Sequence, residues 1–515
     1  MARYKPYDYN QMSMIPVSLE EQLSPGTLEF AIHHLIEDYL DLELFNQRYN
    51  NDETGRKAID PKVLLKIILF GYSRGLLSSR DLEKACKENV VFMALSCGET
   101  PDHSTIAEFV STMEEEILSL FIQVLLICEE EGLLGGTHFS IDGVKLPSNA
   151  SKEWSGTFGD LRNKKEKLQK KIEEIIRGHK NEDKKLKNKK DNSDKKLDSR
   201  LKKLKQKAEK IEKFLKDNEP KEGANNKEKQ SNITDNDSAK MVSSHGVIQG
   251  YNATAIVDEK HQVIAYAEAF GENKDSKHTR SMFEGAGKIL EEAGRENPLR
   301  GVKITADNGF FSAESLKACE EYEVDAYIPD SKYRKRDPNL EDAVKYQRAT
   351  NRKKTNHRKG KGLFTVEDFK FNEEGRLICP AGKALYIRNR NFKTKQGLKG
   401  INYKAPITAC RNCELRSKCL RKENTESRQV HIFYEKIHEG ITDRMREKID
   451  SPEGRKTYSK RLGIIEPVFA NIRARKRMDK FTLRGKIKVN IQWLLYCIIH
   501  NIEKIMNYGE RFAEV

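Results

Sequence analysis

The sequence predicts an α/β protein that has a helical N-terminal region and two insertions in its α/β core. Apolar residues recur at helical spacing between residues 18 and 130. After residue 135, short apolar strands alternate with helical segments, which is the pattern of an α/β core. Between residues 197 and 215 an apolar seam steps by four and three residues, as in a coiled coil.

The charge of the chain predicts a polyanionic partner. The 515 residues include 94 Lys and Arg against 79 Asp and Glu, a formal net charge of +15. An excess of this size favours nucleic acid as the partner. The most apolar stretch, residues 63–72, is too short to cross a bilayer and contains Lys66. The N-terminus lacks a secretory signal, and nine cysteines form no even disulfide framework, so we expect a soluble cytoplasmic protein.

Residues 1–130 are predicted to form a helical DNA-binding domain. Within it, "PDHSTIAEF" places Asp102, His103 and Ser104 at a helix entrance, because Thr105 and Glu108 have the spacing of a capping box. Ordinary capping accounts for these residues. Short helices in this region are also compatible with a helix-turn-helix-like DNA reader, and the sequence leaves both interpretations open.

Residues 161–230 are predicted to be an inserted basic arm, an antiparallel hairpin of two helices. Its seam consists of Leu197, Leu201, Leu204, Ala208, Ile211 and Leu215. Residues 161–217 contain 23 Lys and Arg against 11 Asp and Glu, so most of the net charge lies here. A solvated coiled coil explains many lysines, whereas their concentration favours an arm that grips DNA.

The α/β core is predicted to comprise residues 131–160 and 231–330, completed by C-terminal helices at 441–515. A strand hairpin over residues 246–270 precedes a helix, a strand ending near Asp307, another helix and a last strand. Residues 331–440 form the second insertion. This insertion opens with a basic loop at 331–361 and contains four cysteines.

Three acids are candidates for catalysis. Asp142 interrupts a buried strand, and Asp307 stands at the C-terminal end of another, where α/β sheets commonly bind ligands. Glu466 precedes Pro467, which fits the first position of a helix. Each acid has an ordinary explanation as a turn, capping or dipole residue. Together, two strand carboxylates and one helix carboxylate can converge on Mg²⁺ ions for phosphoryl transfer.

The chain resembles DDE transposases of bacterial insertion sequences, whose catalytic domain has an RNase H-like fold. The resemblance runs nearly end to end, through "PDHSTIAEF", "SIDGVKLPSNAS", "QGYNATAIVDEKHQVI", "ITADNGFFS", "DAYIP" and "EPVFANIR…LRGKIKVNIQWLLYCIIHN". It implies that Asp142, Asp307 and Glu466 are the DDE ligands of Mg²⁺ or Mn²⁺, in a bacterial, nucleoid-associated protein.

The resemblance extends to a Tyr-Arg-Glu-Lys signature. Tyr458, Arg461 and Glu466 match its first three members, although four residues rather than three separate Arg461 from Glu466. Arg473 stands where the signature has Lys, and keeps a positive charge with a different geometry. The resemblance implies that Tyr458, Arg461 and Arg473 contact DNA. Core packing and a surface ion pair are the alternative roles of Tyr458 and Arg461.

The activity that the resemblance implies is cleavage of double-stranded DNA at the terminal inverted repeats, followed by strand transfer into target DNA. Synapsis of two ends implies a homodimer on DNA. Two alternatives stay open at this point. One is a metal-dependent nuclease of the same fold that does not join strands, and the other is a non-catalytic DNA-binding protein.

The second insertion contains a candidate zinc site. Cys379 opens "CPAGKA", and "CRNCELRSKC" supplies Cys410, Cys413 and Cys419. A Cys-x-x-Cys pair is a common zinc-binding unit, and four thiolates would close a structural site. Free structural thiols are the alternative. The remaining cysteines are expected to be small core residues: Cys86, Cys97, Cys128, Cys319 and Cys497.

Overall fold

The computed structural model describes residues 18–49, 57–183, 192–223, 228–243, 246–338, 363–393, 399–420, 422, 424–433 and 439–512. The chain divides into two compact units. The first consists of residues 1–310, 318–327 and 457–515, and the second of residues 311–317 and 328–456. Within the described ranges, no helix is both long and apolar enough to cross a bilayer.

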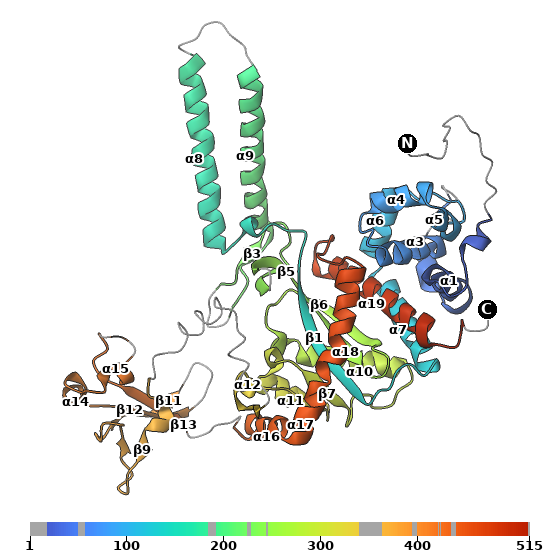
Figure 1. Cartoon of the computed structure of the whole chain (residues 1–515). Helices are drawn as coiled ribbons and strands as arrows, with labels where there is room; N and C mark the ends of the chain where they lie inside the picture. Colours follow the sequence, from blue (N-terminus) through green and yellow to red (C-terminus); the bar gives the residue numbers. More distant parts are fainter. Residues whose placement is uncertain are drawn as a thin grey trace, which may run out of the picture. The chain divides into compact units, whose positions relative to one another are not determined.

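The N-terminal region is helical, as predicted (Figure 1). Its main helices are α1 (Leu28–His34), α3 (Pro61–Ser73), α4 (Ser79–Glu88), α5 (Val90–Leu95), α6 (His103–Thr112) and α7 (Glu114–Glu130). The predicted helix entrance at residues 102–104 is confirmed, but the capping residue is Asp102, whose side chain accepts from the backbone N–H groups of Ser104 and Thr105. The long C-terminal helix α19 (Lys486–Tyr508) packs against α7 and α3.

A mixed sheet forms the centre of the first unit. Its strands are β1 (His138–Pro147), β4 (Ala239–Ser243), β5 (Gly246–Asp258), β6 (Ile264–Phe270), β7 (Lys303–Ala306) and β8 (Asp325–Tyr327). The order is β4-β5-β1-β7-β8, and β6 also pairs with β5. β1 is antiparallel to β5 but parallel to β7, and β7 is parallel to β8. The carboxyl ends of β1 and β7 therefore point the same way, which is the edge where the predicted aspartates lie.

Helices α10 (Thr279–Glu292) and α11 (Ala313–Glu321) separate the last strands of the sheet. The predicted order of hairpin, helix, strand, helix and strand is thus confirmed. The hairpin β5–β6 and helix α10 lie where the sequence predicts them, and the core is formed from Phe139, Ile141, Ile256, Phe283 and Ile304, all fully buried. Side chains alternate between the two faces of a strand, so the even-numbered residues from His138 to Asp142 share one face of β1, and the first four residues of β1 are all buried.

The helix that carries Glu466 begins earlier than predicted. α18 spans Arg461–Ala470, so Pro467 lies inside it and not at its first position. Proline lacks the N–H that would bond to the Gly463 carbonyl four residues earlier. The Gln262 side chain donates to that carbonyl instead, at 2.9 Å. The helix thus tolerates the proline because the turn after β5 supplies the missing hydrogen bond.

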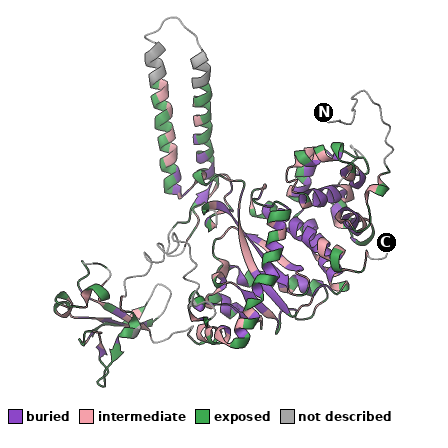
Figure 2. Ribbon diagram, in the orientation of Figure 1, coloured by how far each residue is buried: buried purple, intermediate pink, exposed green. Residues whose placement is uncertain are grey.

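The predicted basic arm consists of two helices that lie side by side, α8 (Phe158–Asp183) and α9 (Asn192–Asp217) (Figure 1). Of the predicted seam, Ala208 and Ile211 are buried, and Leu201 and Leu204 are half-buried. The Leu197 side chain lies outside the described residues. At the base of the arm, Phe158, Leu161, Ile211, Phe214 and Ile233 form a hydrophobic cluster of their own, while most other described side chains of the arm are exposed (Figure 2).

The second unit contains short strands and helices. The strands are β9 (Lys370–Phe371), β10 (Leu377–Ile378), β11 (Tyr386–Lys393), β12 (Lys399–Lys404) and β13 (Gln429–Phe433). The helices include α12 (Tyr333–Arg336), α14 (Ile407–Arg411), α15 (Arg416–Cys419), α16 (Glu439–Asp450) and α17 (Pro452–Ser459). Most of the predicted basic loop at 331–361 lies outside the described residues. The prediction of a loop is wrong for the first part of this range, because α12 is helical. In α12, Arg336 forms ion pairs with Asp330 and Asp450.

One of the five predicted core cysteines is not buried. Cys97 is exposed in the turn after α5, with φ at +54°, whereas Cys86, Cys128, Cys319 and Cys497 are buried as predicted. The apolar pattern of α5 ends before Cys97, at Leu95. The prediction that Cys97 lies in the core, which was based on residue type alone, is therefore wrong.

Stability is expected to fall in acid because of His500 on α19. His500 is fully buried between the Gln262 carbonyl (2.9 Å) and the Asn471 amide (3.0 Å), and burial lowers its pKa to about 3. The unfolded chain binds a proton below about pH 6.5 that the folded chain excludes, so the free energy of unfolding should decrease by about 3 kcal/mol between pH 7 and pH 4.5. Urea unfolding of His500→Gln, which retains a donor and an acceptor, should lack this part of the slope. If the free energy of unfolding of His500→Gln fell with pH as steeply as that of the wild-type chain, His500 would not be the cause. The control is His103→Gln, since His103 is more exposed than His500.

Candidate active site

Asp142 and Asp307 lie next to each other at one edge of the sheet. The hydroxyls of Ser140 on β1 and Thr305 on β7 are hydrogen-bonded at 2.6 Å, so these two side chains share a face. Asp142 and Asp307 each follow two residues later, which returns them to that face. Burial raises the pKa of Asp142 to about 6, and the negative charge of Asp307 adds to the rise. The structure thus brings together two of the three predicted acids.

Arg461, at the start of α18, supplies the opposite charge. Its Nη1 donates to Asp142 Oδ2 at 2.8 Å, and the side chains are only 10% and 18% exposed. The predicted alternative of a surface ion pair is therefore wrong, because this pair is buried. The Arg461 guanidinium also lies 6.0 Å from the centre of the Tyr458 ring. The positive charge counters, but does not cancel, the effect of burial on the Asp142 carboxyl.

Glu466 and Arg473 are placed differently from Arg461. The Glu466 side chain is exposed on α18, and in the described residues no hydrogen bond or ion pair joins it to Asp142 or Asp307. The part of the chain that the structure describes contains no group of three or more His, Cys, Asp or Glu side chains already arranged to hold a metal ion. Arg473 lies in a wide π-helical turn, Asn471–Arg475, which directly follows α18.

A fourth acid, Asp275, lies at the same edge and was not predicted. It sits in a short 3-10 helix, Asp275–Lys277, and its Oδ1 accepts from the Asn252 amide at 2.6 Å. A Cβ built on Gly309 would stand 2.6 Å from Asp275 Oδ2 and 2.8 Å from Asp307 Oδ1. Gly309 thus lets the two carboxylates approach each other. Asp275 lies in the polar segment "GENKDSK", whose composition is that of an ordinary connection. The only feature of the sequence that could have pointed to Asp275 is its position directly before a predicted helix.

The donor set at this edge fits a divalent cation. Carboxylate and amide oxygens are the ligands that Mg²⁺ and Mn²⁺ prefer. Asn252 is fully buried, and its Oδ1 has no hydrogen-bond partner in the described residues. That oxygen faces Gly143, where an added Cβ would stand 2.6 Å from it. Buried polar atoms without partners are uncommon, and a bound cation or its water would satisfy this one.

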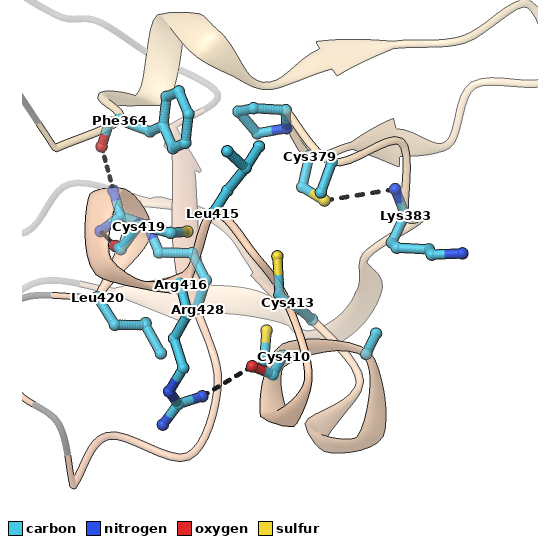
Figure 3. Close-up of a pocket in the computed structure, with 14 residues that line it drawn as sticks. Phe364, Cys379, Lys383, Cys410, Cys413, Leu415, Arg416, Cys419, Leu420 and Arg428 are labelled. Carbon is cyan, nitrogen blue, oxygen red and sulfur yellow. Dashed lines mark hydrogen bonds between the residues drawn. The ribbon is translucent and has the colours of Figure 1, made fainter.

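The four predicted zinc ligands line one pocket of the second unit (Figure 3). Cys379 follows β10, Cys410 is in α14, Cys413 lies just after it, and Cys419 ends α15. All four are half-buried thiols. The two halves of the sequence motif therefore meet, although 30 residues separate Cys379 from Cys410 along the chain.

Two models of known families match parts of the chain. Residues 378–506 match the family model described as a transposase DDE domain, and residues 17–112 match a transposase domain, DUF772. The chain thus carries a DDE transposase domain, which makes it an enzyme of a phosphoryl-transfer class. A DDE domain implies an RNase H-like core and transposition-related processing of DNA. No curated protein matches the chain.

The two matched ranges divide the site. Arg461, Glu466 and the four cysteines of the pocket lie inside the DDE range, whereas Asp142, Asp275 and Asp307 lie outside both ranges. The buried pair of Asp142 and Arg461 connects the matched segment to the sheet.

Proposed function

We propose that this protein cuts double-stranded DNA at the inverted repeats of an insertion sequence and transfers the freed 3′-hydroxyl into target DNA. The observation that carries the proposal is the pair of Asp142 and Asp307 on one sheet edge, with Arg461 against Asp142. Carboxylates beside a buried arginine provide both the ligands for a divalent cation and a contact for a DNA phosphate.

Asp142, Asp307 and Glu466 are the residues that would hold Mg²⁺ or Mn²⁺. When bound, such ions activate the attacking oxygen and stabilise the leaving oxygen of an in-line phosphoryl transfer. Arg461, Tyr458 and Arg473 would contact the DNA backbone. Arg461 pairs with Asp142 in the protein alone, and the same guanidinium would be placed to contact a phosphate next to the carboxylates. Glu466 faces solvent on α18, where it is accessible to DNA-bound ions.

The rest of the charge favours DNA as the substrate. The arm of α8 and α9 contains 23 Lys and Arg over residues 161–217, and most of its described side chains are exposed. Cationic side chains along a helix bind phosphates with little dependence on sequence. Recognition of the repeats is assigned to the N-terminal helices, and synapsis of two ends to a homodimer formed on DNA.

A strand-transfer assay tests the proposal. The purified protein is incubated with Mn²⁺, a labelled DNA duplex that carries the inverted repeat bracketing its gene, and a supercoiled target plasmid. Cleavage at the repeat end, with label joined covalently to the plasmid, is the expected result. Cleavage without joining would identify a nuclease, and binding without cleavage would contradict a catalytic role. A duplex with a scrambled repeat is the matched control.

A further inference from the structure

The strands and short helices at 364–433 have a core too small to stabilise them alone. The buried hydrophobic side chains described in this segment form one cluster: Phe369, Leu377, Leu385, Tyr403, Ala405 and Val430. Cys379, Cys410 and Cys419 pack against it. Segments of this size commonly need disulfides or a structural metal, because so few apolar side chains offset the conformational entropy lost on folding. All four cysteines are free thiols, so no disulfide provides the additional stability.

The geometry points to a structural zinc site formed by Cys379, Cys410, Cys413 and Cys419. Their side chains surround one pocket, as Figure 3 shows. Zn²⁺ prefers four thiolates in a closed tetrahedral set, and such a site leaves no position for catalysis. Because the thiols are not yet at ligating positions in the described residues, metal binding should draw them inward and order the segment.

Hydrogen-bond donors and two arginines surround the pocket that the four cysteines line. The backbone N–H of Lys383 donates to Cys379 Sγ at 3.3 Å, across a turn that Gly382 closes with φ at +73°. Arg428 and Arg416 line the pocket and donate to the carbonyls of Cys419 and Cys410. Two guanidinium groups compensate the net negative charge of four thiolates on Zn²⁺.

Metal analysis of the full chain tests this inference. Protein purified without chelating tags should contain about one zinc per chain, as expected for one four-thiolate site. Co²⁺ in its place should show the absorption of tetrahedral thiolate coordination. Cys413→Ser should lower the zinc content about tenfold, whereas Cys97→Ser, at an exposed cysteine outside the pocket, should not change it. Wild-type protein without zinc but with four reactive thiols, or with two disulfides, would overturn the site even if Cys413→Ser does not fold.

A second, independent observation concerns Asp275, and it depends on the function proposed above. Asn252 donates to Asp275 Oδ1 at 2.6 Å. A Cβ built on Gly309 would stand within 2.8 Å of both Asp275 Oδ2 and Asp307 Oδ1, and one built on Gly143 would stand 2.6 Å from the unpartnered Asn252 Oδ1. Two glycines therefore occupy the positions where any other residue would push these polar groups apart. We infer that Asp275 is a further carboxylate ligand of the cation held at Asp142 and Asp307.

Calorimetric titration with Mn²⁺ in the absence of DNA tests this ligand. Asp275→Asn retains the oxygen that accepts from Asn252, so folding should persist while Mn²⁺ affinity falls about tenfold or more. Glu291→Gln, an exposed acid on α10, is the matched control. If Asp142→Asn and Asp307→Asn weaken Mn²⁺ binding but Asp275→Asn does not, Asp275 is not a ligand and the proposed function stands. If none of the three weakens binding, the metal site itself is wrong.

Discussion

Asp142→Asn and Asp307→Asn should each reduce DNA cleavage and strand transfer by about 100-fold or more, because each variant removes a charged ligand from the metal site. The rates are measured on a labelled repeat-end duplex with saturating Mn²⁺. Asparagine keeps the shape of the side chain and one acceptor oxygen. Asp142→Asn leaves the buried Arg461 guanidinium an acceptor but no opposite charge, so folding of this variant is checked by urea unfolding.

DNA affinity separates a catalytic defect from a general one. In EDTA, both variants should bind the repeat-end duplex at least as tightly as the wild-type chain, since each loses a negative charge near the phosphates. Glu291→Gln should cleave at the wild-type rate. If either aspartate variant, in a preparation free of wild-type protein, cleaved DNA at the full rate, that aspartate would not be a ligand of the metal site.

Arg461→Ala should lower the free energy of unfolding by about 3–5 kcal/mol, because it leaves the buried Asp142 carboxylate without its partner. The measurement is urea unfolding at pH 7.5 without divalent ions, where Asp142 is ionised. Arg461→Lys should recover part of the loss, since it restores the charge but not the shape of the guanidinium group.

A double-mutant cycle isolates the Asp142–Arg461 pair. In the Asp142→Asn background, Arg461→Ala should cost much less than in the wild-type chain, because no buried carboxylate is left unpaired. An equal cost in both backgrounds would show that Arg461 stabilises the fold through packing alone.

Arg473→Ala, in the π-helical turn, should change stability little and should weaken DNA binding.

Local sequence patterns predicted the strands and helices well. The strand around Asp142 was recognisable as an apolar run, and Asp307 as its counterpart before an Asn-Gly turn, because both signals are contained within about ten residues. The helix that contains Pro467 could not be predicted in this way. The hydrogen bond that compensates for the proline comes from Gln262, which is 201 residues away from Gly463.

Asp275 shows the same limit at the candidate site. Its own segment is short, polar and without periodicity, so nothing local distinguishes it from a solvent-exposed turn. Its position emerges only when β5 pairs with β1 and brings Asn252 beside Gly143. The Cys97 error has a similar origin, since residue type predicts average burial but not the turn in which the residue lies.

The distance along the chain between the buried charges determines when the site forms during translation. Asp142 and Arg461 are 319 residues apart, and β1 pairs with a strand more than 100 residues later. At a typical elongation rate of about 5–20 residues per second, Asp142 leaves the ribosome at least about 15 seconds before its arginine. A nascent chain therefore holds an unpaired carboxylate and no finished site, and DNA processing has to wait until the C-terminal helices have been synthesised and packed.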